Sequence, residues 1–295
     1  MARDRILLTN DDGIDAVGLR AMFDALTDEY EVTVVAPTED RSSIGRAASH
    51  EVDVTDHELG YAVSGTPVDC VIAGLGTLVP DADAVVAGCN KGANLGGYVL
   101  GRSGTVSAAV EATFFDVPAI AASMYVPGGD DWWKRDLGPG RFAHATRATR
   151  FLVDHAVGAG VFDSVEYLNV NAPIAEDETE PEAADVGDDG HDTDSDHGTD
   201  IDHGTDSDHA PMRVTRPSTW YGMDAERNGA GEVAFHDRIW DRIRDGDVPD
   251  PVGTDRRAVL DGEVSVSPLS APHASTDHDA LDELVDAYVN QSRTT

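Results

Sequence analysis

Short apolar runs alternate with amphipathic segments along the first 175 residues, which is the pattern of an α/β protein. Ile6–Thr9 is an apolar run typical of a strand buried on both faces, and Gly18–Leu26 carries apolar residues at helical spacing. Glu31–Ala36 is a second apolar run. A strand, a helix and a strand in this order predict a right-handed crossover within a parallel sheet.

The pattern then continues to the C-terminal part of the chain. We predict a hairpin within 47–64, a helix that begins at Pro67, strands at Ala84–Ala87, Val117–Ser123 and Tyr167–Val170, and helices at Val106–Phe115 and Arg141–Val157. Order is predicted to resume at Met212–Thr215, with a hairpin arm between Trp220 and Phe235, a strand at Val264–Ser267 and a closing helix at Leu281–Val289. The predicted fold is therefore a Rossmann-like, mostly parallel sheet flanked by helices, with a C-terminal β-hairpin arm.

Residues 176–211 interrupt this pattern. They contain 15 acidic residues, no Lys or Arg, and a histidine-containing hexad repeat that ends at Ala210. Because the segment has almost nothing to bury, we expect a disordered acidic insertion. The predicted organisation is a catalytic core over 1–175, this insertion, and an arm, strand and helix over 212–295 that complete the domain and the oligomer. Metal chelation by the repeat's histidines is conceivable, but a solvated insertion is the simpler interpretation.

Charge narrows the possible partners. The net charge of −35, from 56 acidic and 21 basic residues, argues against binding to nucleic-acid backbones or to anionic membranes. Lys91 and Lys134 are the only lysines, and an acidic, lysine-poor surface is typical of proteins from a high-salt cytoplasm. No apolar run approaches the roughly 20 residues of a membrane span, and the N-terminus enters a strand almost at once, so we expect a cytoplasmic protein. The two cysteines suggest no disulfide framework.

Polar groups follow three of the predicted strands. Asn10-Asp11-Asp12-Gly13 follows the first strand, Arg41-Ser42-Ser43 lies beyond the second, and Asn90 to Asn94 lie in a glycine-rich loop after the third. The carboxyl ends of parallel strands meet at one edge of a sheet, where ligands bind. Two adjacent carboxylates at a buried strand end are costly unless a partner compensates them, and a donor set made of oxygens suits Mg²⁺ or Mn²⁺. The alternative is that Asp11 and Asp12 only cap the next helix.

Ser103-Gly104-Thr105 lies at the predicted start of a helix. Such a start offers backbone N–H groups and hydroxyls to an anion. A cation site and an anion site at the same edge of a sheet indicate phosphate-ester chemistry.

These motifs together resemble the SurE survival-protein family of metal-dependent nucleotidases. The resemblance covers nearly the whole chain except residues 176–211. It is carried by Thr9-Asn-Asp-Asp-Gly-Ile14, Val35-Ala-Pro37, Arg41-Ser42, Gly65-Thr-Pro67 with Asp69-Cys70, Gly88-Cys-Asn-Lys-Gly-Ala-Asn-Leu-Gly96, Ser103-Gly-Thr105, Asn169-Val-Asn171, Thr254-Asp255 and Val264-Ser-Val-Ser-Pro-Leu269. Ala93 stands where the family usually has proline, and Ser43-Ile44 differ from its common small pair.

The resemblance implies a phosphatase of nucleoside 5′-monophosphates, with 3′-monophosphates as further candidates, and one divalent cation per subunit, Mg²⁺ or Mn²⁺. By motif position the metal ligands would be Asp11, Asp12, Ser42 and Asn90, the phosphate contacts Asn94, Ser103, Gly104 and Thr105, and the catalytic carboxylates Asp11 and Asp12. It also implies a homodimer or homotetramer with an exchanged C-terminal arm. The alternatives are a broad-range phosphatase or exopolyphosphatase, and a nucleotide-binding module without turnover. A binder would not need two carboxylates beside a phosphate, because they repel an anion unless a metal intervenes.

Overall fold

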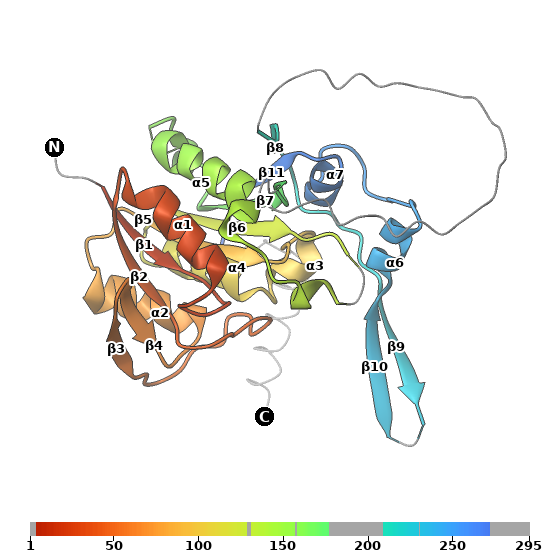
Figure 1. Cartoon of the computed structure of the whole chain (residues 1–295), viewed down its shortest axis with the longest axis horizontal. Helices are drawn as coiled ribbons and strands as arrows, with labels where there is room; N and C mark the ends of the chain where they lie inside the picture. Colours follow the sequence, from red (N-terminus) through yellow and green to blue (C-terminus); the bar gives the residue numbers. More distant parts are fainter. Residues whose placement is uncertain (1–3, 129–130, 157, 177–208, 230, 272–295) are drawn as a thin grey trace, which may run out of the picture.

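A mixed β-sheet forms the centre of the protein. The computed structural model describes residues 4–128, 131–156, 158–176, 209–229 and 231–271. Within these ranges, nine strands form one sheet in the order β3-β4-β2-β1-β5-β6-β7-β11-β8 (Figure 1). The strands are β1 (Arg5–Thr9), β2 (Glu31–Pro37), β3 (Val54–His57), β4 (Gly60–Val63), β5 (Ala84–Lys91), β6 (Ala119–Tyr125), β7 (Tyr167–Pro173), β8 (Met212–Val214) and β11 (Val264–Leu269).

Most neighbouring strands run parallel, as the sequence predicts. The pairs β2–β4, β1–β2, β1–β5, β5–β6, β6–β7 and β8–β11 are parallel. The strands β3 and β11 run antiparallel to β4 and β7. The predicted α/β fold is thus confirmed, and β8 and β11 from beyond residue 211 join the same sheet. The predicted domain boundaries themselves stay a prediction.

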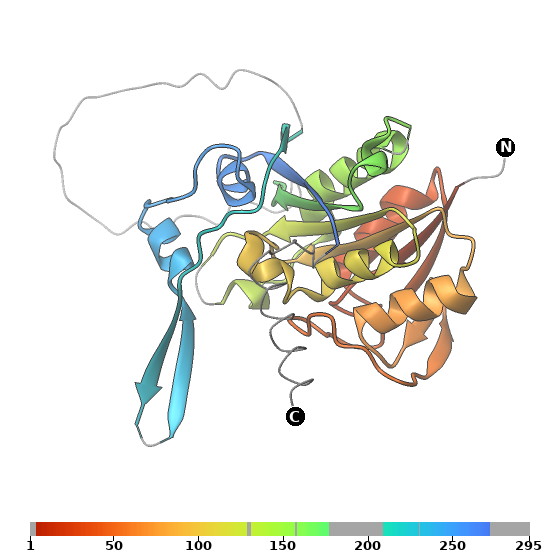
Figure 2. The ribbon, with the colours of Figure 1, turned by 180° about the vertical axis from the view of Figure 1, so that it is seen from behind.

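Helices cover both faces of the sheet. The helices are α1 (Val17–Thr27), α2 (Pro67–Ala73), α3 (Gly97–Leu100), α4 (Gly104–Thr113), α5 (Ala143–Ala156), α6 (Arg238–Arg244) and α7 (Asp255–Leu260), with short turns of other helix types at Gly74–Leu78, Trp132–Lys134, Pro139–Phe142 and Val161–Asp163. Figures 1 and 2 show α1 and α5 on one face, and α2 and α4 on the other.

Strand β1 shows why this layered arrangement forms. Ile6 and Leu8 pack into the cluster beneath α1 and α5, whereas Leu7 between them packs into the cluster beneath α2 and α4. Successive side chains of a strand point to opposite faces, so a continuous apolar run is buried on both sides. The central position of β1 places the polar residues that follow it at the middle of the sheet's carboxyl edge.

Several boundaries differ from the predicted ones. We predicted a loop from Gly88 onward, but strand β5 continues to Lys91. The pairing with β6 is interrupted after Ala87, and Asn90 and Lys91 then pair with Ser123 and Met124. Strand β6 runs two residues beyond the predicted end, and β7 extends to Pro173. The closing helix predicted at 281–289, and most of the acidic insertion, lie outside the described residues.

The predicted C-terminal arm is a two-stranded hairpin. Strands β9 (Met223–Asn228) and β10 (Glu232–Asp237) pair antiparallel, and they extend away from the sheet (Figure 1). Val233 and Phe235 are 49% and 72% exposed. No sheet lies beneath these apolar side chains in the described residues. An isolated two-stranded hairpin is marginally stable at best, so the arm needs a further surface to cover it.

A buried polar cluster joins the C-terminal part to the rest of the fold. The guanidinium of Arg256 contacts both carboxylate oxygens of Asp250 at 2.9 and 3.1 Å, and these two side chains are 3% and 0% exposed. Asp255 accepts N–H groups from Gly96 at 2.7 Å and from Ser218 at 2.9 Å. Helix α7 is therefore tied directly to the glycine-rich segment that follows β5.

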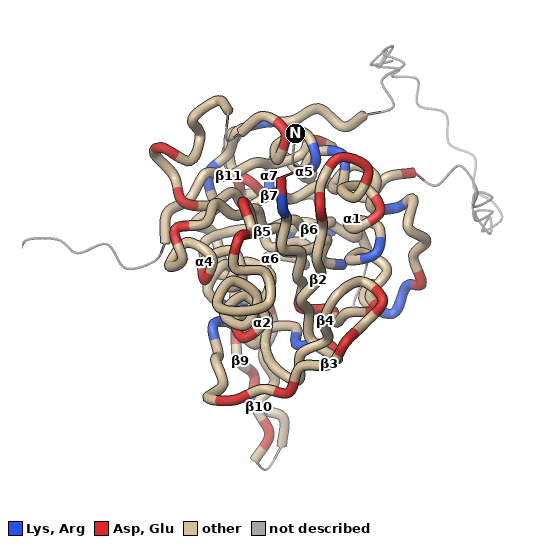
Figure 3. Tube along the Cα trace, turned by 90° about the vertical axis from the view of Figure 1, so that its left-hand side faces the viewer, with Lys and Arg blue, Asp and Glu red and all other residues tan. Residues whose placement is uncertain are grey.

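Apart from Asp11 and Asp69, the other charged side chains of the described residues are exposed or half-buried. Figure 3 shows Asp and Glu distributed around the molecule, with Lys and Arg between them. Among the described residues, no helix is both long and apolar enough to cross a membrane.

Candidate metal and phosphate site

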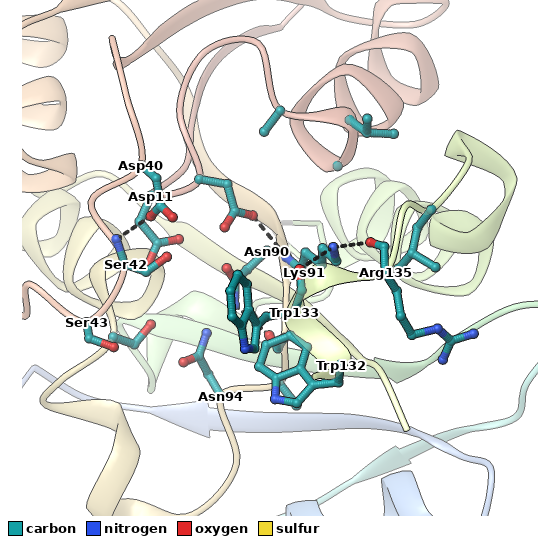
Figure 4. A pocket seen from close by; sticks show the side chains of 18 of the residues that line it. Asp11, Asp40, Ser42, Ser43, Asn90, Lys91, Asn94, Trp132, Trp133 and Arg135 are labelled. Atoms are coloured by element: carbon teal, nitrogen blue, oxygen red, sulfur yellow. Dashed lines mark hydrogen bonds between the residues drawn. The ribbon is translucent and has the colours of Figure 1, made fainter. Parts of the chain in front are cut away.

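The carboxyl ends of the central strands surround a single cavity of about 780 Å³. Six of the predicted site residues line it, namely Asp11, Asp12, Ser42, Asn90, Asn94 and Ser103. Figure 4 labels Asp11, Ser42, Asn90 and Asn94 of this group, which come from three separate segments of the chain and lie around one space. The expectation that strand-end loops converge at one edge of the sheet therefore agrees with the structure.

Asp11 is held by the start of α4. Its Oδ1 accepts the hydroxyl of Thr105 at 2.5 Å, and its Oδ2 accepts the Thr105 backbone N–H at 3.1 Å. Gly104 leaves the space that this requires, because a Cβ atom there would lie 2.8 Å from Asp11 Cβ and Oδ2. The positive end of the helix thus faces a carboxylate of the protein itself.

This contact changes the expected role of the helix start. Thr105 is fully buried against Asp11, and neither Thr105 nor Gly104 lines the cavity. Ser103 lines the cavity, and its hydroxyl accepts the N–H of Val106 at 3.1 Å. The structure therefore brings Ser103 to the site directly and places Thr105 behind Asp11, while contact between these residues and a phosphate stays a prediction.

Asp12 lies beside Asp11 and is oriented from β5. Its Oδ2 accepts the backbone N–H of Lys91 at 3.0 Å. The extension of β5 to Lys91, which the sequence did not predict, supplies this donor. Burial raises the pKa of both Asp11 and Asp12, and the charge of Asp11 raises the pKa of Asp12 further.

Capping of the following helix does not explain this pair. Helix α1 begins at Val17, and its N-cap is Ala16, which makes no side-chain capping bond. Instead, Asn10 donates its amide N–H to the carbonyl of Gly13 at 2.8 Å and shapes the turn between strand and helix. The helix-capping interpretation is therefore wrong for Asp11 and Asp12.

Neutral oxygen donors complete the group. The Asn90 amide nitrogen donates to the carbonyl of Gly92 at 2.5 Å, which leaves its amide oxygen available to a cation. Ser42 is placed by Asp40, whose carboxylate accepts the Ser42 N–H at 2.7 Å. Within the described ranges no cluster of three or more His, Cys, Asp or Glu side chains of the kind that holds a metal occurs. Two carboxylates with neutral oxygens fit a hard divalent cation rather than zinc.

Asn94 is fixed by strands β6 and β7. Its side-chain amide donates to the hydroxyl of Ser123 at 2.9 Å, and its backbone N–H donates to Asn171 Oδ1 at 2.7 Å. The Asn94 carbonyl accepts the amides of Asn169 and Asn171 at 3.0 and 3.1 Å. These contacts explain how two buried asparagines of β7 support the loop without lining the cavity.

Sequence reasoning missed the opposite wall of the cavity. Trp132, Trp133 and Arg135 line it from the segment after β6, and Trp240 of α6 also contributes. No periodic pattern distinguishes residues 126–142, so no signal beyond two adjacent tryptophans could have placed them here.

Comparison with known proteins agrees with this geometry. Residues 6–192 match the family model described as "Survival protein SurE". The chain is 53% identical to a protein from Haloquadratum walsbyi and 56% identical to one from Haloarcula marismortui, both named "5′-nucleotidase SurE"; the alignments cover 97% and 98% of this chain and 97% and 96% of the relatives. The crystal structure of a SurE protein from Aquifex aeolicus matches with a TM-score of 0.67 and 26% identity, over 92% of this chain and 95% of that one.

Proposed function

We propose that this chain, which belongs to the survival protein SurE family and is a 5′-nucleotidase, needs a divalent cation to hydrolyse nucleoside monophosphates. The proposed ligands of the cation are Asp11, Asp12, Ser42 and Asn90. The observation that supports the cation most strongly is a pair of adjacent carboxylates, Asp11 buried and Asp12 half-buried, beside neutral oxygens in one cavity. A phosphate dianion would be repelled from such a pair without a metal between them. Mg²⁺ and Mn²⁺ are the proposed cations.

The two carboxylates have different surroundings, which suggests different roles. Thr105 engages both oxygens of Asp11, so Asp11 is suited to hold a fixed position beside the cation. Lys91 engages only Oδ2 of Asp12, which leaves Oδ1 to orient the attacking water and to accept its proton. A bound cation supplies a Lewis acid that polarises a phosphoryl oxygen and lowers the pKa of a bound water.

The phosphate would lie between the carboxylates and the Asn94–Ser103 side of the cavity. Asn94 and Ser103 are both nearly buried and are held by the contacts described above. Donors fixed in advance lose little freedom when the substrate binds and cost no reorganisation during the reaction. Attack by a carboxylate on phosphorus is the alternative, and trapping of an acyl-phosphate would reveal it.

Removal of the cation tests this proposal directly. We expect phosphate release from 5′-AMP and 5′-GMP to be abolished by EDTA and restored by excess Mn²⁺ or Mg²⁺. The same assay with 3′-AMP, p-nitrophenyl phosphate and tripolyphosphate separates a nucleotidase from a broad-range phosphatase or an exopolyphosphatase. Turnover that persists in EDTA after dialysis would contradict the metal-dependent mechanism.

We also propose that the protein is a homodimer or homotetramer. The arm formed by β9 and β10 exposes Val233 and Phe235, and a second copy of the chain would cover them. Light scattering at micromolar concentration should give a multiple of 31.3 kDa, and the mass of a single chain would contradict the proposal. A cytoplasmic location stays a prediction, which cell fractionation would check.

A further inference from the structure

Aromatic side chains form the wall of the cavity that faces the candidate ligands. Figure 4 shows the rings of Trp132 and Trp133 next to Asn90 and Asn94, while Asp11, Asp40 and Ser42 lie on the other side. All of these residues line the same cavity. The cavity therefore joins an oxygen-rich end to an aromatic end, which is the distribution of polarity in a nucleotide.

Trp133 presents a ring surface that is open to a ligand. The residue is 59% exposed, although large apolar residues of a folded protein are mostly buried. The ammonium of Lys134 lies 5.1 Å from the centre of the ring. This contact is a cation–π interaction, and it orients the indole without enclosing it.

Trp132 is fixed against the glycine-rich loop. A Cβ atom on Gly92 would lie 2.6 Å from Cη2 of Trp132, so the ring packs directly on the glycine backbone. Gly92 also has a φ of +128°, a conformation that side chains rarely adopt. Trp132 thus anchors the tryptophan segment to the loop that carries Asn90 and Asn94.

Lys91 connects this segment to the proposed metal site. Its ammonium donates to the carbonyls of Trp133, at 2.9 Å, and of Arg135. Its backbone N–H is the group that orients Asp12. Both lysines of this lysine-poor chain therefore contact Trp133, and one of them also positions a carboxylate of the site.

We propose that Trp133, supported by Trp132, is the surface on which the base of a nucleoside monophosphate stacks; this inference rests on the proposed function. A base is flat and has a π-face, so an exposed indole can bind it through stacking. Stacking tolerates every base, so the subsite selects for the presence of a base more than for its identity. Ribose 5-phosphate, which has the same phosphate and sugar, cannot use this surface.

A comparison of substrates with and without a base tests the inference. We measure kcat and KM of the metal-loaded full chain for 5′-AMP, 5′-CMP and ribose 5-phosphate in wild type, Trp133→Ala and Trp133→Phe. Trp133→Ala should lower the ratio of kcat/KM for nucleotides to kcat/KM for ribose 5-phosphate by about 5- to 100-fold, mainly through KM. Trp133→Phe should recover part of this ratio, because it keeps an aromatic face. The matched control, Phe151→Ala, removes an exposed ring of α5 that does not line the cavity and should leave the ratio unchanged.

Two results would overturn the inference. An equal loss for nucleotides and ribose 5-phosphate would show that Trp133 only supports the fold of the site. An unchanged ratio together with a smaller mass in light scattering would show that Trp133 belongs to an interface between subunits.

A binding measurement separates this inference from the proposed activity. Titration of tryptophan fluorescence with 5′-AMP, and with ribose 5-phosphate as the probe without a base, reports stacking without turnover. A stronger quench by 5′-AMP that disappears in Trp133→Ala would support the stacking surface even in a protein that released no phosphate. An equal quench in wild type and Trp133→Ala would refute the stacking surface, whatever the activity.

Discussion

Asp12→Asn is expected to lower phosphatase activity at least about 100-fold while the protein remains folded. The substitution keeps the size of the side chain but removes one negative charge and one basic oxygen from the pair that is proposed to hold the cation. Loss of several kcal/mol of transition-state stabilisation corresponds to a loss of this size. The asparagine oxygen can still accept the N–H of Lys91, so the local fold should survive.

Stability measurements give the same variant a second readout. In EDTA its melting temperature should equal or exceed that of wild type, because the repulsion between the two adjacent carboxylates is relieved. Mn²⁺ should raise the melting temperature less than it does in wild type, since a weaker site yields less stabilisation. Asp24→Asn, an exposed position on α1, is the matched control. Near-wild-type turnover by Asp12→Asn would disprove the role of this carboxylate.

Arg256→Met is expected to destabilise the protein more than any surface substitution. The change leaves Asp250 buried without its cation, and breaking such a pair typically costs about 3–5 kcal/mol. For a chain of this size the melting temperature should fall by roughly 10 °C. Phosphatase activity should also fall, because the neighbouring Asp255 accepts the N–H of Gly96 and so fixes the loop that carries Asn94.

Two further variants show whether the buried pair is the cause. Arg257→Met removes the next arginine, whose partner Asp261 is exposed, and should change the melting temperature little. Adding Asp250→Asn to Arg256→Met should recover part of the lost stability, because no unpaired charge then remains buried. An equal fall in Arg256→Met and Arg257→Met would contradict the assignment.

The sequence predicted the fold and the site best where a strand is buried on both faces, because the direction of such a strand then fixes the edge of the sheet at which its loop lies. The run Ile6–Leu8 could be recognised because it is apolar on both faces, and the polar residues after it had to lie at the edge where the other parallel strands end. The convergence of Asp11, Ser42 and Asn90 followed from that rule alone. The predicted hairpin arm, with its alternating pattern, is confirmed as β9 and β10.

Features that depend on contacts between distant segments could not be predicted. Helices α6 and α7 are short and rich in charge, so neither shows a clear apolar stripe. Arg256 is buried and Arg257 is half-buried, yet the two are adjacent and identical in type. The contact between Thr105 and Asp11 joins residues 94 positions apart, and only the structure shows that this threonine holds a carboxylate.

The placement of the two lysines has a consequence for chemical labelling. An acylating reagent that attacks primary amines finds only Lys91, Lys134 and the N-terminus in this chain. Lys91 donates to two backbone carbonyls, whereas Lys134 is 57% exposed and lies over Trp133. Apart from the N-terminus, an amine-reactive dye therefore meets only residues beside the cavity, and a fluorophore attached through Lys134 would lie next to Trp133 without any engineered cysteine.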